Sequence, residues 1–109
     1  MTIIKKHTSF GELLRSLRED AGQTLKTVAE NLEMDTSLLA KIERNERQPT
    51  KNQIKLLAQI FNEDEKILFA EYLSDQIAYN LLKEGCDVAI LKTVQRKINY
   101  LQKNKNNDR

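Results

Sequence analysis

Two short apolar patterns with helical spacing, separated by only a few residues, most constrain how this chain can fold. Between Gly22 and Thr50, the polar residues Thr24 and Asp35 stand where the N-caps of two helices are expected. Each cap precedes apolar residues that share one helical face: Val28, Ala29 and Leu32 after Thr24, and Leu38, Leu39 and Ile42 after Asp35. Two amphipathic helices joined by so short a turn predict a helix-turn-helix.

Capping residues predict helices in the rest of the chain as well. Ser9 and Glu12 have the spacing of a capping box, and Gly22 can end the helix that follows in the left-handed conformation. Asn45 can end the helix after Asp35 in the same way. Thr50 and Gln53 form a second capping box. With three glycines and one proline in 109 residues, the chain is expected to be all-α, with six helices.

Residues 63–109 have a different organisation. Apolar residues recur every four positions from Phe69 to Leu81, and then with the 3-4-3 spacing of a coiled-coil seam from Leu91 to Leu101. Gly85 interrupts the two patterns, which predicts an antiparallel helical hairpin. Its two arms carry opposite charge, since residues 63–84 hold six acidic and two basic side chains and residues 85–109 hold two and six. We therefore expect a domain at residues 1–62 and a helical hairpin at residues 63–109.

Composition excludes several classes of protein. No apolar run approaches the roughly 20 residues of a membrane span, so no membrane partner is expected. Cys86 is the only cysteine, which excludes an internal disulfide and a cysteine-based metal cluster and favours a cytoplasmic setting. No Gly-rich phosphate loop, metal constellation or nucleophile with a matching base is present, so we expect no enzyme activity, cofactor or metal. The net charge of +2 does not by itself identify a nucleic-acid partner.

The helix expected after Asp35 has the residues needed to contact double-stranded DNA. Its first turn carries Thr36 and Ser37, and that end of a recognition helix enters the major groove. Lys41 follows Ser37 by four residues and so lies on the same face. In the loop after the helix, Arg44 and Arg47 are placed to meet phosphates. The preceding helix adds two candidate DNA-contacting residues at its start, Thr24 and Lys26.

The same stretch resembles the XRE (Cro/C1-type) helix-turn-helix family of repressors from about Phe10 to Phe61. The positions that match the family are Ala29, Leu32, Leu39, Ile42-Glu43-Arg44 and Pro49. The resemblance implies a compact, lambda-repressor-like domain of five helices, usually dimeric on a palindromic operator. It implies that Thr36, Ser37 and Lys41 read bases, and that Glu43 is a buried acid paired with Arg18.

Two positions depart from the family pattern. Leu25 stands where many members place a glutamine that contacts DNA, so this chain lacks the side chain that makes that contact. Glu33 replaces a frequent glycine, and the turn must therefore tolerate a side chain. The C-terminal region is similar, more weakly, to small regulators that control restriction-modification systems.

These observations predict a homodimeric, sequence-specific transcriptional regulator, most simply a repressor or autoregulator. The apolar residues of the hairpin are its expected dimer interface: Phe69, Leu73, Ile77, Leu91, Val94, Ile98 and Leu101. The alternative is an antitoxin-like module whose hairpin binds a partner protein while the helix-turn-helix autoregulates. A partner protein that co-purifies in equal amounts would favour that alternative.

Overall fold

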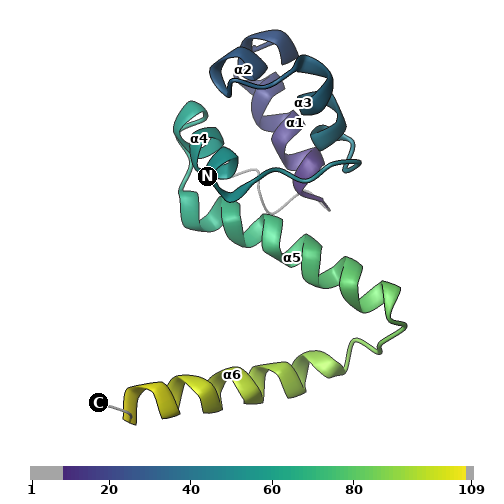
Figure 1. Cartoon of the computed structure of the whole chain (residues 1–109), viewed down its shortest axis with the longest axis vertical. Helices are drawn as coiled ribbons and strands as arrows, with labels where there is room; N and C mark the ends of the chain where they lie inside the picture. Colours follow the sequence, from purple (N-terminus) through teal and green to yellow (C-terminus); the bar gives the residue numbers. More distant parts are fainter. Residues whose placement is uncertain (1–8, 108–109) are drawn as a thin grey trace. The chain divides into compact units, whose positions relative to one another are not determined.

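The computed structural model describes residues 9–107, which form six α-helices and no strand (Figure 1). The helices are α1 (Phe10–Asp20), α2 (Leu25–Asn31), α3 (Thr36–Glu43), α4 (Lys51–Ile60), α5 (Glu65–Lys83) and α6 (Ile90–Asn107). The predicted all-α class is confirmed. Within the described residues, no helix combines the length and the apolar character that crossing a membrane requires.

Hydrogen-bonding side chains cap the starts of α1, α2 and α4, as the sequence predicts. Ser9 Oγ accepts from the backbone N–H of Glu12 at 3.1 Å, and Thr24 caps α2 in the same way. At α4 the capping box is complete, because Thr50 Oγ1 accepts from the N–H of Gln53 while Gln53 Oε1 accepts from the N–H of Thr50. Such caps satisfy N–H groups that have no partner within the helix.

Left-handed residues end the helices. Positive φ angles occur just after five of them, at Gly22, Glu33, Asn45, Asn62 and Gly85. Each is accompanied by the crossed hydrogen bonds of a Schellman motif, which satisfy the last carbonyls of the helix. The predicted stops at Gly22 and Asn45 are thereby confirmed.

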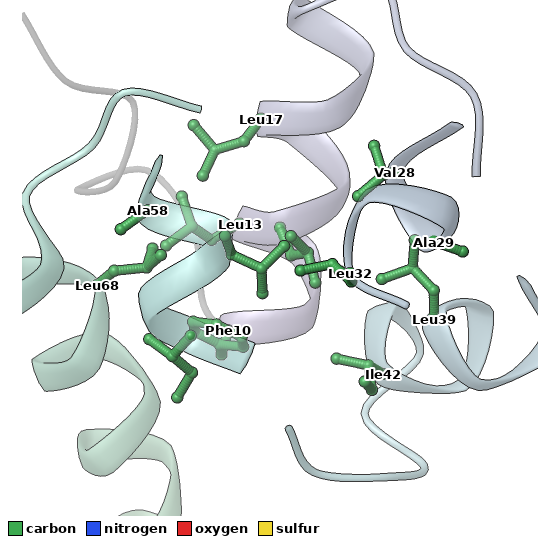
Figure 2. Close-up of a cluster of buried hydrophobic side chains, with 13 residues drawn as sticks. Phe10, Leu13, Leu17, Val28, Ala29, Leu32, Leu39, Ile42, Ala58 and Leu68 are labelled. Atoms are coloured by element: carbon green, nitrogen blue, oxygen red, sulfur yellow. The ribbon is translucent and has the colours of Figure 1, made fainter. Parts of the chain in front are cut away.

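The hydrophobic core draws on five of the helices (Figure 2). Leu13, Val28, Leu39, Leu57 and Leu68 come from α1 to α5 in turn, and each is 1% exposed or less. Their burial holds α2 and α3 against α1, which fixes the helix-turn-helix as part of a packed domain.

The first half of α5 belongs to this domain. Leu68 is buried, and Phe69 and Tyr72 pack against the core, with the Tyr72 ring edge-on to Phe10 at 5.8 Å between centroids. The first compact unit of the chain accordingly continues to Gln76, beyond the boundary expected after Asn62. A sequence pattern shows that α5 is apolar on one side, but not that α4 leads this helix back onto the core.

The second compact unit begins at Ile77 and contains the end of α5 and all of α6. A turn at Gly85 joins the two helices, and Asp87 Oδ1 accepts from the N–H of Ala89 at 2.7 Å ahead of α6. The two helices and the break between them are as predicted. Their apolar residues stay exposed, since those expected at the interface from Leu73 to Leu101 are 39–62% exposed.

Candidate nucleic-acid interface

Helix α3 has one buried face and one exposed face. Leu39, Ile42 and Glu43 are buried against the rest of the domain, whereas Thr36, Ser37 and Lys41 are exposed. The three residues expected to read bases therefore share a solvent-facing surface on a helix that is held from behind. This is the arrangement that a helix needs to enter the major groove of DNA.

The turn between α2 and α3 is formed with a glutamate in the left-handed position. Glu33 has φ 55° and an exposed side chain, and the N–H of Met34 donates to Ala29 O at 3.0 Å across the turn. The turn thus tolerates the side chain, at the conformational cost that a non-glycine residue meets at this φ. Asp35 occupies the N-cap position of α3, but its side chain makes no capping hydrogen bond, in contrast to the expectation from sequence.

Arg18 and Glu43 form a nearly buried ion pair beneath α3. Arg18 Nε donates to Glu43 Oε2 at 2.7 Å and Nη2 donates to Oε1 at 3.1 Å, and the two side chains are only 12% and 6% exposed. Nη1 of Arg18 also donates to Gln23 O at 3.0 Å. The hydrogen bond with Glu43 raises the pKa of Arg18 above its ordinary value, against the opposing effect of burial. The pair that the family resemblance implies is therefore present, and it links α1 to α3.

Asn45 ties the end of α3 to the start of α1. Its Oδ1 accepts from the N–H of Gly11 at 3.0 Å, and its Nδ2 donates to Ser9 Oγ at 3.1 Å. A Cβ atom at Gly11 would collide with the backbone oxygens of Ile42 and Glu43, so only glycine allows this close approach of the two helices. From the sequence we assigned Asn45 only a helix-ending role, because the contact joins residues 34 positions apart.

The loop after α3 contains a second ion pair, which we did not predict from the sequence. Arg44 Nε donates to Glu46 Oε2 at 2.8 Å, and Arg44 Nη2 donates to Glu46 Oε1 at 3.3 Å. These bonds raise the pKa of Arg44 and lower that of the Glu46 carboxyl. Arg47 is exposed in the same loop, which the buried Pro49 anchors. Opposite charges two residues apart were the available signal for the pair.

The start of α2 presents the other candidate DNA contacts. Thr24 caps the helix and also donates its hydroxyl to Thr27 Oγ1 at 3.0 Å, while Lys26 is exposed. Leu25 packs against the core, which accounts physically for an apolar residue where related sequences place glutamine. Contacts to DNA at this helix start would thus come from Lys26 and backbone N–H groups.

The expected dimer-interface residues are of two kinds. Phe69 packs on the core of its own chain, and Lys51 Nζ lies 5.1 Å from the centre of its ring. The other six are exposed: Leu73, Ile77, Leu91, Val94, Ile98 and Leu101. We therefore restrict the candidate interface to these six residues, called the apolar seam below. Among the side chains that the structure describes, no group of His, Cys, Asp and Glu is arranged to hold a metal ion.

Comparison with known proteins agrees with this geometry. The sequence model of a family described as a helix-turn-helix domain matches residues 9–66, more than half of the chain. The chain therefore belongs to this XRE-like helix-turn-helix family, whose fold defines a DNA-binding regulator.

Among solved structures, the chain is similar to one in the SinR protein/SinI protein complex. The likeness has a TM-score of 0.52 at 18% sequence identity, and it covers 89% of this chain and 98% of the other. At that identity it shows a shared fold. No curated protein matches the sequence.

Proposed function

We propose that this protein is a homodimeric, sequence-specific regulator of transcription that binds a palindromic operator in double-stranded DNA. One observation carries the proposal: α3 presents Thr36, Ser37 and Lys41 on a single exposed face, while its opposite face is buried in the core. Short polar and cationic side chains at these positions suit hydrogen bonding to base edges in the major groove. We further propose that it acts in the cytoplasm as a repressor or autoregulator, without enzyme activity or a cofactor.

The proposed dimer follows from the small size of the DNA-reading surface. One short recognition helix contacts only a few base pairs, and dimers overcome this by placing two helices about one turn of DNA apart. The apolar seam supplies a surface for such a dimer. At about 25 cal/mol per Å² of apolar surface buried, covering a few of these side chains yields several kcal/mol before the cost of association is subtracted.

A second candidate function rests on the same apolar seam. An exposed apolar surface of this kind also suits a partner protein, as in an antitoxin-like module. The SinR protein, whose fold is similar, is found in a complex with the SinI protein. A partner protein that co-purifies in equal amounts with this chain, and that is lost when the apolar seam is substituted, would favour this function over the homodimer.

Two substitutions on the exposed surface test the proposed mode of DNA binding. Lys41→Ala should weaken operator binding by about 1–3 kcal/mol and relax the sequence preference at one position of each half-site. Arg47→Ala should weaken binding to all DNA alike and reduce the salt dependence by about one unit of slope. Titrations on operator and scrambled DNA at several salt concentrations distinguish these effects. Equal weakening of both DNAs by Lys41→Ala would contradict a base-reading role for Lys41.

A further inference from the structure

Arg44 continues the exposed face of α3 by one more turn. It follows Lys41 by three residues and Ser37 by seven, so it lies on the same side of the helix. As the C-cap it has φ −92° and ψ 6°, close enough to helical values to keep this direction. The small, half-buried Ala40 one turn earlier leaves room beside it. Arg44 is therefore placed with the residues that face the bases, although it belongs to the loop.

Glu46 fixes the orientation of the Arg44 guanidinium. Its two carboxylate oxygens accept from Nε and Nη2, which together form one edge of the planar group. The other edge, made by Nη1 and the second hydrogen of Nη2, binds no acceptor among the described residues. Two parallel hydrogen bonds give a more definite geometry than a single contact. The free edge is thus a pre-oriented pair of donors.

We propose that Arg44 reads a guanine in each half-site through this free edge, and that Glu46 is the positioning residue that holds it. The inference rests on the proposed function. Guanine presents two acceptors in the major groove, O6 and N7, which match the two donors of a guanidinium edge. Arg44 then determines specificity, whereas its loop position alone suggested a phosphate contact.

The negative charge of Glu46 favours a guanine over a phosphate as the acceptor for Arg44. A phosphate carries its own negative charge and is repelled by the carboxylate of Glu46, whereas the edge of a guanine is neutral. Lys41 lies near enough to Glu46 to contribute to the lowered pKa of its carboxyl, so a second cation of this face shares the same negative charge. Glu46 thus weakens the attraction of this surface for any DNA backbone and leaves base recognition to the guanidinium edge.

The first test compares Arg44→Lys with Arg47→Lys in the full-length protein. Both variants keep the positive charge, but lysine lacks the planar pair of donors. The wild-type protein first selects its operator from a random DNA pool. Arg44→Lys should then weaken operator binding roughly 5- to 150-fold and lose the preference for one guanine in each half-site. Arg47→Lys should select the same site as the wild type. If Arg44→Lys also selects the unchanged site with unchanged affinity, the inference is overturned.

A modified base tests the contact directly. Replacing the assigned guanine by 7-deazaguanine removes the N7 acceptor. This change should weaken operator binding by the wild-type protein, whereas the Arg44→Lys variant should bind the modified and unmodified operators equally well. Equal losses for both proteins would show that another residue reads this base.

Glu46→Gln gives a second test in which the two explanations predict different ratios of operator affinity to affinity for unrelated DNA. If Glu46 positions Arg44, the substitution tightens binding to unrelated DNA but lowers the ratio of operator to unrelated affinity by roughly fivefold or more. If Glu46 only repels DNA, both affinities rise together and the ratio is unchanged, which overturns the inference. A wild-type protein that selects no operator would instead refute the proposed function. The two failures are therefore distinguishable.

Discussion

The backbone N–H of Phe10, at the start of α1, donates a hydrogen bond to Asp75 Oδ2 in α5 at 2.8 Å. The next two backbone N–H groups of α1, those of Gly11 and Glu12, donate to Asn45 and Ser9. The first turn of α1 is thus satisfied by side chains from three different parts of the chain. This polar junction joins α5 to the helix-turn-helix in addition to the apolar contact of Leu68.

Asp75→Ala should lower the free energy of unfolding by about 0.5–2 kcal/mol, the usual effect of losing a helix cap. The substitution leaves the N–H of Phe10 without its acceptor and removes a negative charge from the positive end of α1. A thermal melt of the full-length protein measures the effect. Ser74→Ala is the control, because Ser74 is exposed and donates only to Glu71 O in its own helix. Equal melting temperatures for the two variants would show that the Asp75 contact contributes no stability.

Arg18→Ala should lower the free energy of unfolding by about 3–5 kcal/mol, because it leaves the buried Glu43 carboxylate without its partner. We expect the preferred DNA sequence to be unchanged, since Arg18 lies beneath α3 and not on its exposed face. Thermal melts and DNA titrations on the same samples test both statements.

Arg15→Ala provides a matched control for Arg18→Ala. Arg15 pairs with Glu19 one turn later in the same helix, but the two side chains are 64% and 53% exposed. Such an exposed pair contributes less than about 1 kcal/mol. If both variants melt alike, the account of the buried pair is wrong. An unchanged melt of Arg18→Ala together with lost DNA binding would place Arg18 on the DNA surface.

Glu33→Gly should stabilise the protein by up to about 1 kcal/mol, because glycine relieves the left-handed conformation at φ 55°. Asn45→Gly should have the opposite sign, although Asn45 has a similar φ of 63°. There the substitution removes hydrogen bonds to Gly11 and Ser9. Denaturant unfolding of both variants compares the two effects. A stabilised Asn45→Gly would contradict the importance of the junction between α3 and α1.

Leu91→Asp combined with Ile98→Asp should convert the proposed dimer to monomer without unfolding either chain, because both side chains are about half exposed. Operator affinity should then fall far more than affinity for unrelated DNA, since the two half-site contacts become independent. Sedimentation measures the association state. Lys92→Gln with Arg96→Gln changes the charge by the same two units on the side of α6 away from the apolar seam and should remain dimeric. If the Leu91/Ile98 variant stays dimeric, the apolar seam is not the dimer interface.

Local features of the fold could be predicted from the sequence because they depend on neighbouring residues. The cap at Ser9, the capping box of Thr50 and Gln53, and the left-handed stop at Gly22 each involve residues no more than a few positions apart. Apolar periodicity likewise indicates which face of a helix is buried. Asp35 is the exception, since its position as N-cap was predicted but its side chain makes no capping bond.

Contacts between distant segments could not be predicted from local sequence patterns. The hydrogen bond from the Phe10 N–H to Asp75 joins residues 65 positions apart, and no local pattern indicates it. The pairing of Arg18 with Glu43 came from the family resemblance and not from spacing. Phe69 shares the periodicity of the apolar seam, yet it packs on its own core, because periodicity identifies an apolar face without identifying the neighbour that covers it.

Selection of binding sites from a random DNA pool by the full-length wild-type protein tests the central claim most directly. The account predicts enrichment of a two-fold symmetric site whose half-sites lie about 10 base pairs, or a multiple of that, from centre to centre. The Lys41→Ala variant should lose the base preference at one position of each half-site and keep it at the other positions. A pool that shows no enriched sequence after repeated rounds, with a protein that melts cooperatively, would contradict sequence-specific DNA binding by this chain.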